Sequence, residues 1–341
     1  MTSGSDIEVC RLTHPSGAYI EVSNYGATWL SACMPDRHGV LGEVLFGYST
    51  IDAMMADPNY AGRTVGRYAN RIRKGTFSIC GKTYQLEIND GVNSNHSGPS
   101  GMSFRVFDIV SRTDNSVTLH YLSKDGEGGF PANVDIYVSY TLTADFCVRI
   151  DYRATTDAPT ILNLTNHAYF NLTGHGDIYL HRLHIPSTTM LQTDQEFLPT
   201  GMVLDVTDTP FDFSEGKQVG KDINFDMDQF RWNRGYNHCY MCAEEQGANK
   251  KSRLMAELMS DETGRSVAMY STYPSVQIYS GGFLSSSYPT RFGRTALPAD
   301  GIALEAQFAP DTPNQPAFPQ CTLTPEKDYC HQIIYRFQTF A

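Results

Sequence analysis

The sequence contains few positively charged residues, and this limits the partners that the protein can have. Its 341 residues include 26 Lys and Arg against 37 Asp and Glu, which gives a net charge of −11. An acidic surface repels phosphate backbones and anionic lipid headgroups, so we expect neither nucleic acid nor membrane as a partner. An uncharged small molecule is not opposed by this charge.

Long hydrophobic runs and export signals are also missing. No stretch of the sequence reaches the apolar length that a transmembrane helix requires. Residues 1–8 contain neither the basic nor the apolar region of a secretory signal peptide. We therefore expect a cytoplasmic protein in which most of the eight cysteines are reduced, buried thiols.

The cysteines form no complete metal-binding pattern. Cys239 and Cys242 make a single CxxC pair, and a zinc site would need a second pair with similar spacing. Cys321 and Cys330 lack that spacing. The sequence therefore predicts no metal site, and the CxxC pair is interpreted as core thiols.

Helical patterns are scarce, and alternation with a period of two dominates. Apolar residues alternate with polar ones in residues 117–121, 136–142, 146–152 and 331–337, as in half-buried strands. Turn-forming residues are frequent, with 28 Gly and 17 Pro. We predict an all-β fold, a large antiparallel β-sandwich with few short helices, in which residues 1–341 form a single domain.

Three short segments carry local predictions. Residues 254–259 and 266–270 flank a turn at residues 260–264 and are interpreted as a hairpin rather than a helix. Residues 52–56 are a candidate short helix. The Pro-rich residues 310–319 are interpreted as a structured loop near a functional site, because strand patterning resumes beyond them.

Two segments far apart in the sequence each place one titratable side chain among apolar, amide and hydroxyl groups. Residues 163–171 are centred on His167, and residues 301–314 are centred on Glu305. A histidine and a carboxylate brought together can act as proton donor and acceptor, because their surroundings can push their pKa values apart. Amides and hydroxyls such as that of Tyr169 recognise polyols, so the combination indicates sugar chemistry.

Several motifs in one order resemble those of the aldose 1-epimerase (galactose mutarotase) family. The resemblance runs nearly from end to end and is carried by residues 24–27, 66–77, 93–98, 125–131, 163–171 and 301–314. It implies the large antiparallel supersandwich of galactose mutarotase, with the sugar in an open cleft on one sheet. It also implies that Glu305 is the base and His167 the acid.

The same resemblance assigns substrate-binding residues. His96 matches the second active-site histidine of the family, which helps to hold the ring oxygen and the adjacent hydroxyls. Asn70 and Arg71 match an Asn-Arg pair, and Gln277 matches a glutamine near the substrate. From composition alone, a structural carboxylate paired with a buried arginine is slightly favoured for Glu305, and the match to the family motif reverses that order. Considered alone, Arg71 is also compatible with a salt bridge inside a strand.

One position departs from the family pattern. The mutarotases have a Gly-x-Asp-His motif whose aspartate accepts hydrogen bonds from sugar hydroxyls, and Asn237 stands at that position in Gly235–His238. An amide oxygen still accepts a hydrogen bond but lacks the charge, and the amide nitrogen only donates. We expect a weaker or altered substrate preference with the proton-transfer chemistry retained.

Interconversion of aldose anomers requires proton transfers alone, so we expect no cofactor. The predicted function is an aldose 1-epimerase that acts on free aldohexoses of the glucose and galactose type, as a monomer or homodimer. One alternative is a hexose-6-phosphate 1-epimerase, which needs a basic cluster such as Arg63, Arg67, Arg71 and Arg73. A non-catalytic carbohydrate-binding sandwich is the other. A glycosidase is disfavoured because it needs two carboxylates, and only Glu305 lies in a fitting motif.

Overall fold

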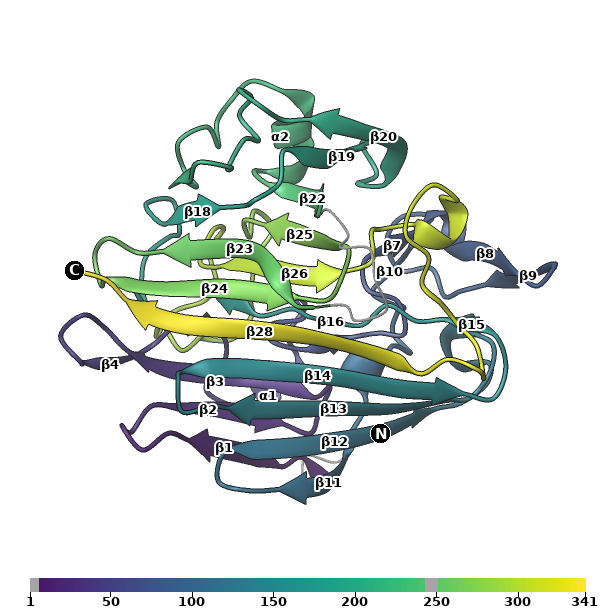
Figure 1. Cartoon of the computed structure of the whole chain (residues 1–341), viewed down its shortest axis with the longest axis horizontal. Helices are drawn as coiled ribbons and strands as arrows, with labels where there is room; N and C mark the ends of the chain where they lie inside the picture. The colour runs from purple at the N-terminus through teal and green to yellow at the C-terminus, as the bar shows by residue number, and fades with distance from the viewer. Residues whose placement is uncertain (1–5, 243–250) are drawn as a thin grey trace.

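Two large antiparallel sheets pack against each other in the computed structural model, which describes residues 6–242 and 251–341 (Figure 1). The shared core contains side chains from both sheets, such as Val138 and Ile150 from one and Leu304 from the other. The Tyr335 hydroxyl donates a hydrogen bond across the layers to the Leu304 carbonyl, at 3.1 Å. The predicted all-β sandwich is confirmed.

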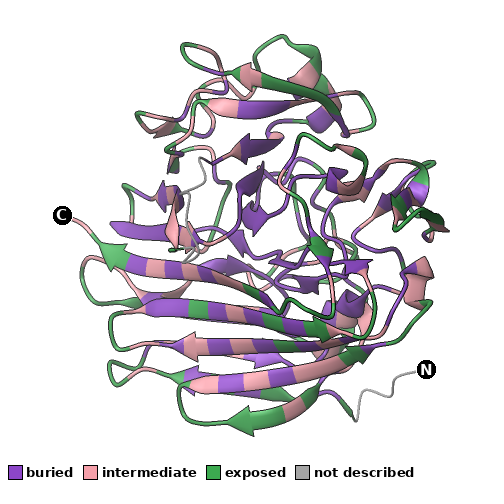
Figure 2. Ribbon diagram, turned by 45° about the vertical axis from the view of Figure 1, so that its right-hand side comes forward, coloured by how far each residue is buried: buried purple, intermediate pink, exposed green. Residues whose placement is uncertain are grey.

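The larger sheet has nine strands, and the alternation in the sequence becomes burial on one face. In Figure 2 buried and more exposed positions alternate along these long strands. Ile136, Val138 and Tyr140 point into the core, whereas their neighbours in the strand are less buried. In spatial order the strands are β11 (Asp108–Arg112), β12 (Ser116–Ser123), β13 (Val134–Leu142), β14 (Cys147–Thr156), β28 (Tyr329–Thr339), β24 (Arg265–Ser271), β23 (Arg253–Met259), β18 (Arg182–His184) and β21 (Lys217–Gln218).

The second sheet has seven strands, and β26 (Ile302–Gln307) is buried at every position. Ile302, Leu304 and Ala306 belong to the core between the sheets. Because successive side chains of a strand point to opposite faces, Ala303, Glu305 and Gln307 lie on the other face. The spatial order is β20 (Pro199–Asp205), β19 (Thr189–Thr193), β22 (Asn237–Met241), β25 (Ser275–Tyr279), β26, β17 (Tyr169–Phe170) and β5 (Leu45–Phe46).

Smaller elements complete the sandwich. A four-stranded sheet contains β1 (Val9–Thr13), β2 (Tyr19–Ser23), β3 (Thr28–Pro35) and β4 (Leu41–Glu43). The two-stranded pairs are β6 (Thr64–Val65) with β16 (Thr165–Asn166), β7 (Arg71–Ile72) with β10 (Ser94–Asn95), β8 (Thr76–Ile79) with β9 (Lys82–Gln85), and β15 (Thr160–Ile161) with β27 (Thr322–Leu323). The helices are α1 (Ile51–Met55) and α2 (Asp228–Asn233), with short 3-10 turns at Arg73–Gly75, Met102–Phe104, Glu127–Gly129 and Thr312–Asn314.

The local predictions agree with these elements. Strands β23 and β24 form the hairpin predicted around residues 260–264. The predicted short helix is α1, whose first turn is capped by the Thr50 hydroxyl. Cys239 and Cys242 are buried free thiols. Throughout residues 6–242 and 251–341, no helix is long and apolar enough to cross a membrane.

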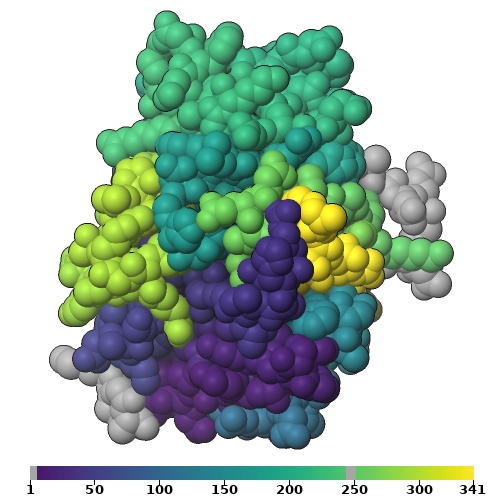
Figure 3. Space-filling view, turned by 90° about the vertical axis from the view of Figure 1, so that its left-hand side faces the viewer, coloured from purple at the N-terminus to yellow at the C-terminus, as the bar shows by residue number. Residues whose placement is uncertain are grey.

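The segment from β19 to α2 lies at one end of the molecule. It forms the top of Figure 1 and the teal and green mass at the top of the side view in Figure 3. Strand β22 joins it to the centre of the seven-stranded sheet through its pairing with β25. Phe197, in the turn between β19 and β20, lines the same cavity as Glu305, so this turn lies near the face of β26 that carries Glu305.

The core face of β26 should be essential for stability. We expect Leu304→Ala to lower the free energy of unfolding by about 2–5 kcal/mol, because Leu304 is fully buried between the sheets. Chemical denaturation measures this loss. Leu122→Ala, at a position in β12 that is 45% exposed, is the matched control and should cost well under half as much. Equal losses in the two variants would contradict this account of the core.

Candidate active site

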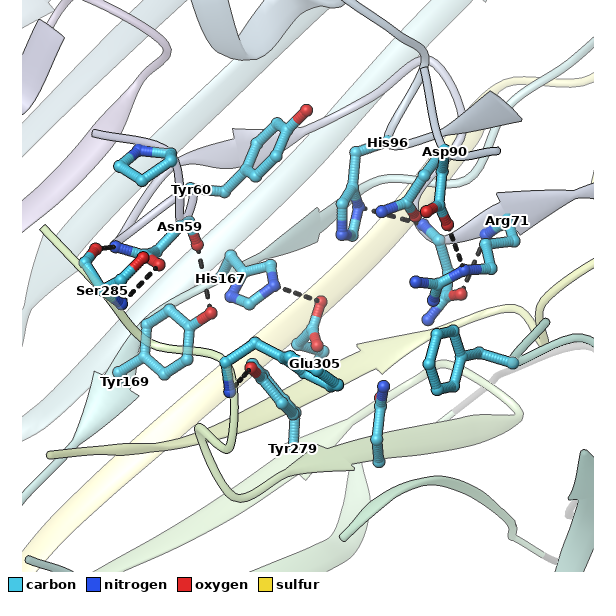
Figure 4. A pocket seen from close by; sticks show the side chains of 16 residues that line it. Asn59, Tyr60, Arg71, Asp90, His96, His167, Tyr169, Tyr279, Ser285 and Glu305 are labelled. Atoms are coloured by element: carbon cyan, nitrogen blue, oxygen red, sulfur yellow. Dashed lines mark hydrogen bonds and ion pairs between the residues drawn. The ribbon is translucent and has the colours of Figure 1, made fainter. Parts of the chain in front are cut away.

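A cavity of about 400 Å³ opens over the face of the seven-stranded sheet that carries Glu305 (Figure 4). Seven of the residues selected from the sequence line it, which are Asn70, Arg71, His96, His167, Tyr169, Asn237 and Glu305. Gln277 is not among the lining residues. It is the cross-strand neighbour of Glu305 in β25 and β26, and it donates a hydrogen bond to Asn237, which does line the cavity.

Strand register explains how distant parts of the sequence meet here. Gln277 lies opposite Glu305, and Tyr279 and Tyr169 lie opposite Ala303 from the two sides of β26. Because directly paired residues share a face of the sheet, these side chains point the same way as Glu305. Side chains from three neighbouring strands therefore meet on one face of this sheet.

His167 approaches Glu305 from the residues just before β17. Its backbone is fixed by hydrogen bonds, with its N–H donating to the Arg63 carbonyl and its own carbonyl accepting from Gly62. The imidazole Nε2 lies 3.7 Å from Glu305 Oε2, which is too long for a hydrogen bond. Within the described residues, neither Glu305 Oε2 nor His167 Nδ1 has a hydrogen-bond partner. The pair thus faces the cavity with unused hydrogen-bonding capacity.

Burial sets the protonation of this pair. Desolvation raises the pKa of Glu305 to about 8, and the Coulombic attraction of Arg71 only partly opposes the rise. Burial also lowers the pKa of His167 to about 4. Near neutral pH these two shifts place the titratable proton of the pair on the carboxyl group of Glu305 and leave His167 neutral.

His96 presents a hydrogen-bond donor to the cavity. Its Nδ1 accepts the backbone N–H of Asn70 at 3.1 Å, so the neutral ring carries its proton on Nε2. Burial lowers the pKa of His96 well below its ordinary value, and the neighbouring His167 and Arg71 act in the same direction. Figure 4 shows the His96 ring pointing toward His167, and their centroids are 5.3 Å apart.

Arg71 forms a salt bridge, as one interpretation of the sequence suggested, and it also lies at the site. Its Nε donates to Asp90 Oδ2 at 2.7 Å, so it does form a salt bridge, and it also lines the cavity. Its backbone carbonyl accepts the N–H of Asp311, which lies in the Pro-rich segment. That segment is therefore a structured loop beside the cavity.

The other three arginines considered for a phosphate site point elsewhere. Arg63 is fully buried and donates to the Met54 carbonyl. Arg67 is buried and donates to the carbonyls of residues 123, 124, 131 and 132. Arg73 is paired with Asp194. Of the four, only Arg71 lines the cavity.

Asn237 is oriented by its neighbour. Gln277 Nε2 donates to Asn237 Oδ1 at 2.7 Å, so the amide oxygen of Asn237 is already engaged. The hydrogen bond from Gln277 leaves the amide nitrogen of Asn237 available as a donor, and the residue lines the cavity. An aspartate at this position would offer the cavity an acceptor where Asn237 offers a donor.

Tyr169 contributes a ring rather than a free hydroxyl. Its hydroxyl donates to the Asn59 carbonyl at 3.1 Å, and its ring centroid is 4.8 Å from that of His167. Figure 4 shows the ring beside the imidazole. The contact restricts the orientation of His167 on the side away from Glu305.

Sequence reasoning missed several cavity residues, which are Pro58, Asn59, Tyr60, Asp90, Asn95, Phe197, Tyr279, Phe283 and Ser285. The Tyr60 ring lies beside both imidazoles, with its centroid 4.8 Å from that of His96 and 6.4 Å from that of His167. Its φ of 58° is in the left-handed region that an aromatic residue rarely adopts. No periodicity or motif in the sequence marks such a position.

Comparison with known proteins identifies the family of this chain. The family model described as aldose 1-epimerase matches residues 8–336.

The chain belongs to the aldose 1-epimerase family.

It is 35% identical to the aldose 1-epimerase of Escherichia coli (strain K12) over 337 residues, which cover 98% of this chain and 96% of that protein. The galactose mutarotase of Bos taurus is 36% identical over 324 residues, covering 93% and 90%. A solved aldose epimerase homologue from C. elegans superimposes with a TM-score of 0.90 at 29% identity, covering 98% of this chain and 100% of that one. Such relatives are isomerases, and this aldose 1-epimerase family member shares their fold and class of activity.

Burial of Glu305 should make stability depend on pH in a defined direction. Because its pKa in the folded protein is about 8 against an ordinary 4.5, the folded state keeps a proton that the unfolded chain releases between these values. The contribution of Glu305 to the free energy of unfolding is therefore largest below pH 4.5, and it declines as the pH rises toward 8. We expect Glu305→Gln to be more stable than the parent by a few kcal/mol at pH 8.5, and the difference to shrink toward pH 5.

Thermal or chemical unfolding across this pH range measures the difference. Glu215→Gln, at an exposed position, is the control and should leave the pH dependence of the parent unchanged. A difference between Glu305→Gln and the parent that stays constant with pH would show that Glu305 is not desolvated as described.

Proposed function

We propose that this family member interconverts the α and β anomers of free aldohexoses of the glucose and galactose type, with Glu305 as base and His167 as acid. The observation that carries the proposal is the buried pair on the cavity floor, with 3.7 Å between His167 Nε2 and Glu305 Oε2. The gap is too long for direct hydrogen bonding, and Glu305 Oε2 and His167 Nδ1 have no hydrogen-bond partner among the described residues. We place this activity in the cytoplasm.

The reaction needs two proton transfers, one from the sugar to Glu305 and one from His167 to the sugar. With a closed pyranose bound, ionised Glu305 takes the proton from the O1 hydroxyl while protonated His167 gives one to the ring oxygen, and the C1–O5 bond breaks. The products are the open-chain aldehyde, a protonated carboxyl group and a neutral imidazole. After rotation about the C1–C2 bond, the same two transfers run backward and close the ring on the other face.

The protonation of Glu305 and His167 supports this cycle. The pair with Glu305 protonated and His167 neutral, favoured by burial, is the form that accompanies the open-chain aldehyde. The ion-pair form that accompanies the closed sugar contains the same single proton. No proton has to enter from water during turnover, because the two forms differ only in where that proton resides.

The remaining polar groups suit a pyranose. His96 Nε2–H and the Arg71 guanidinium are donors, and we propose that they hold the ring oxygen, its neighbouring hydroxyls and the alkoxide that develops on ring opening. Asn70, Tyr169, Asn237 and Gln277 complete the proposed binding residues. A hexose-6-phosphate substrate is disfavoured because Arg63, Arg67 and Arg73 are engaged elsewhere.

Polarimetry on freshly dissolved α-D-glucose and α-D-galactose tests the function. We expect the protein to speed the approach to the final rotation, and Glu305→Gln and His167→Asn to lose roughly 100-fold or more of that acceleration, because each removes one proton-transfer partner.

The chain provides a matched control for these two substitutions. His175 and Glu262 form a second histidine–glutamate pair at 3.0 Å, exposed on the surface. His175→Asn and Glu262→Gln should keep the parental rate. Unchanged relaxation of both sugars in the presence of the parent protein would exclude this activity, and saturable sugar binding without acceleration would identify a binding protein instead.

Asn237 should set the level of activity. A carboxylate at this position would accept charge-assisted hydrogen bonds from sugar hydroxyls, which are stronger than those to an amide. We expect Asn237→Asp to raise kcat/KM on glucose and galactose several-fold, and the exposed Asn115→Asp to have no effect. If kcat/KM of Asn237→Asp does not rise, our account of this position is wrong.

A further inference from the structure

The cavity contains a second carboxyl group, which the proton-transfer chemistry proposed above does not use. Among the described residues that line the cavity, Asp90 and Glu305 are the two that carry a carboxyl group. The Glu305 side chain is only 2% exposed, whereas that of Asp90 is 36% exposed. Figure 4 shows Asp90 next to Arg71, on the side of Glu305 away from His167.

A closed turn before β10 holds Asp90 beside the cavity. The Asp90 N–H donates to the Asn93 carbonyl at 3.1 Å, and the Asp90 carbonyl accepts the Asn93 N–H at 2.9 Å. Asn89 fastens the turn to β10, because its side-chain oxygen accepts the Asn95 N–H at 2.7 Å and its amide nitrogen donates to the Asn95 carbonyl at 2.9 Å. The backbone of Asp90 is therefore held in place by contacts other than its salt bridge.

Asp90 and Arg71 use only part of their hydrogen-bonding capacity on each other. Arg71 Nε donates to Asp90 Oδ2 at 2.7 Å. This contact leaves Asp90 Oδ1 available as an acceptor and the terminal nitrogens of the Arg71 guanidinium available as donors. Because both residues line the cavity, a charged acceptor and a charged donor lie side by side at one place on its wall.

An acceptor beside a donor matches the hydroxyl groups of a sugar. A hydroxyl both donates and accepts hydrogen bonds, whereas a carboxylate only accepts and a guanidinium only donates. One sugar hydroxyl can therefore donate to Asp90 while its neighbour accepts from Arg71, each in a charge-assisted hydrogen bond. An anionic group would gain from Arg71 but be repelled by Asp90. The pair thus favours a neutral polyol over a phosphorylated sugar.

The polar groups already assigned to the sugar are mainly donors. His96 presents Nε2–H, and Asn237 presents its amide nitrogen because Gln277 engages its oxygen. Glu305 is assigned to the O1 hydroxyl. An aldohexose has further hydroxyls, each with a proton to donate, and Asp90 is the carboxylate that remains to accept one.

We propose that Asp90 is a substrate-binding residue that accepts a hydrogen bond from a sugar hydroxyl, next to a second hydroxyl held by Arg71. This inference rests on the proposed function, since it assumes that an aldohexose binds over Glu305. It gives the site a specificity-determining carboxylate in addition to the base.

The test measures kcat/KM on D-glucose and on its analogues that lack the hydroxyl at C2, C3 or C4, by NMR exchange spectroscopy at anomeric equilibrium. We expect the parent to disfavour the analogue without the bound hydroxyl by about tenfold or more, as for loss of a hydrogen bond to a charged group. Asp90→Ala should remove most of that preference, mainly through a lower kcat/KM on glucose.

Asp90→Asn separates sugar binding from mere support of Arg71. An amide keeps an oxygen for Arg71 Nε but turns a donor toward the cavity. We therefore expect Asp90→Asn to lose the same preference as Asp90→Ala. Asp151→Asn is the matched control, because Asp151 Oδ2 accepts from Arg149 Nε at 2.8 Å outside the cavity lining. It should leave every ratio unchanged.

Two results of the rate measurements would show that Asp90 does not contact the sugar. One is a set of ratios in both Asp90 variants within about twofold of the parent. The other is an equal loss on glucose and on every analogue. A parent that disfavours none of the analogues also overturns the inference.

Calorimetric titration with the same sugars distinguishes this inference from the proposed function. If the parent binds glucose without accelerating mutarotation, the proposed function fails, and loss of the same preference in affinity by the Asp90 variants still supports Asp90 as a binding residue. If the parent accelerates mutarotation but the variants keep its preferences, only the inference about Asp90 fails. Absence of sugar binding by the parent overturns both.

Discussion

Desolvation of one carboxyl group is the constraint on which the rest of this site depends. Glu305 lies in the middle of a strand that is buried at every position, and its direct cross-strand neighbour is Gln277, an uncharged residue. The side chain has no ion pair with a Lys or Arg within the described residues. A buried carboxyl group without a cationic partner is more stable with its proton than without it. The sheet must supply enough packing energy to hold this group in place, which explains why the opposite face of β26 is purely apolar.

Four residues with a left-handed backbone conformation line the same cavity. Tyr60, Asn70, His96 and Phe197 all line it, and all four have a φ between 51° and 67°. Left-handed conformations at non-glycine residues persist only where surrounding contacts enforce them, and they are common at functional sites. In this molecule they turn side chains from loops toward the sheet. The sheet provides the buried pair, and the strained loops provide the groups that enclose a ligand.

Strand patterning and motif order made much of this structure predictable. Alternation in residues 136–142 and 331–337 predicted β13 and β28, because burial on one face leaves a period of two in the sequence. Segments 163–171 and 301–314 brought His167 and Glu305 into consideration, and the structure places these residues together. The roles of the site residues stay predictions.

Other features of the structure could not be predicted from the sequence. The engagement of the Tyr169 hydroxyl by Asn59 and the position of Gln277 behind Asn237 depend on strand register. Phe197, Phe283 and Tyr60 lie in irregular loops, where tertiary contacts determine the direction of a side chain. Periodicity carries no information there. The pKa values of Glu305 and His167 depend on burial, which is a property of the folded molecule.

The order of the strands has a consequence for how the site forms. The residues that line the cavity come from or adjoin the strands β7, β10, β17, β22, β25 and β26. These strands meet in space but are separated by long stretches of sequence. Contacts of this kind form late, because long loops must close before any of them becomes favourable. No fragment of the chain contains both His167 and Glu305 without the strands between them. The contact between His167 and Glu305 would thus report completion of the whole sandwich, and partially folded chains would lack it.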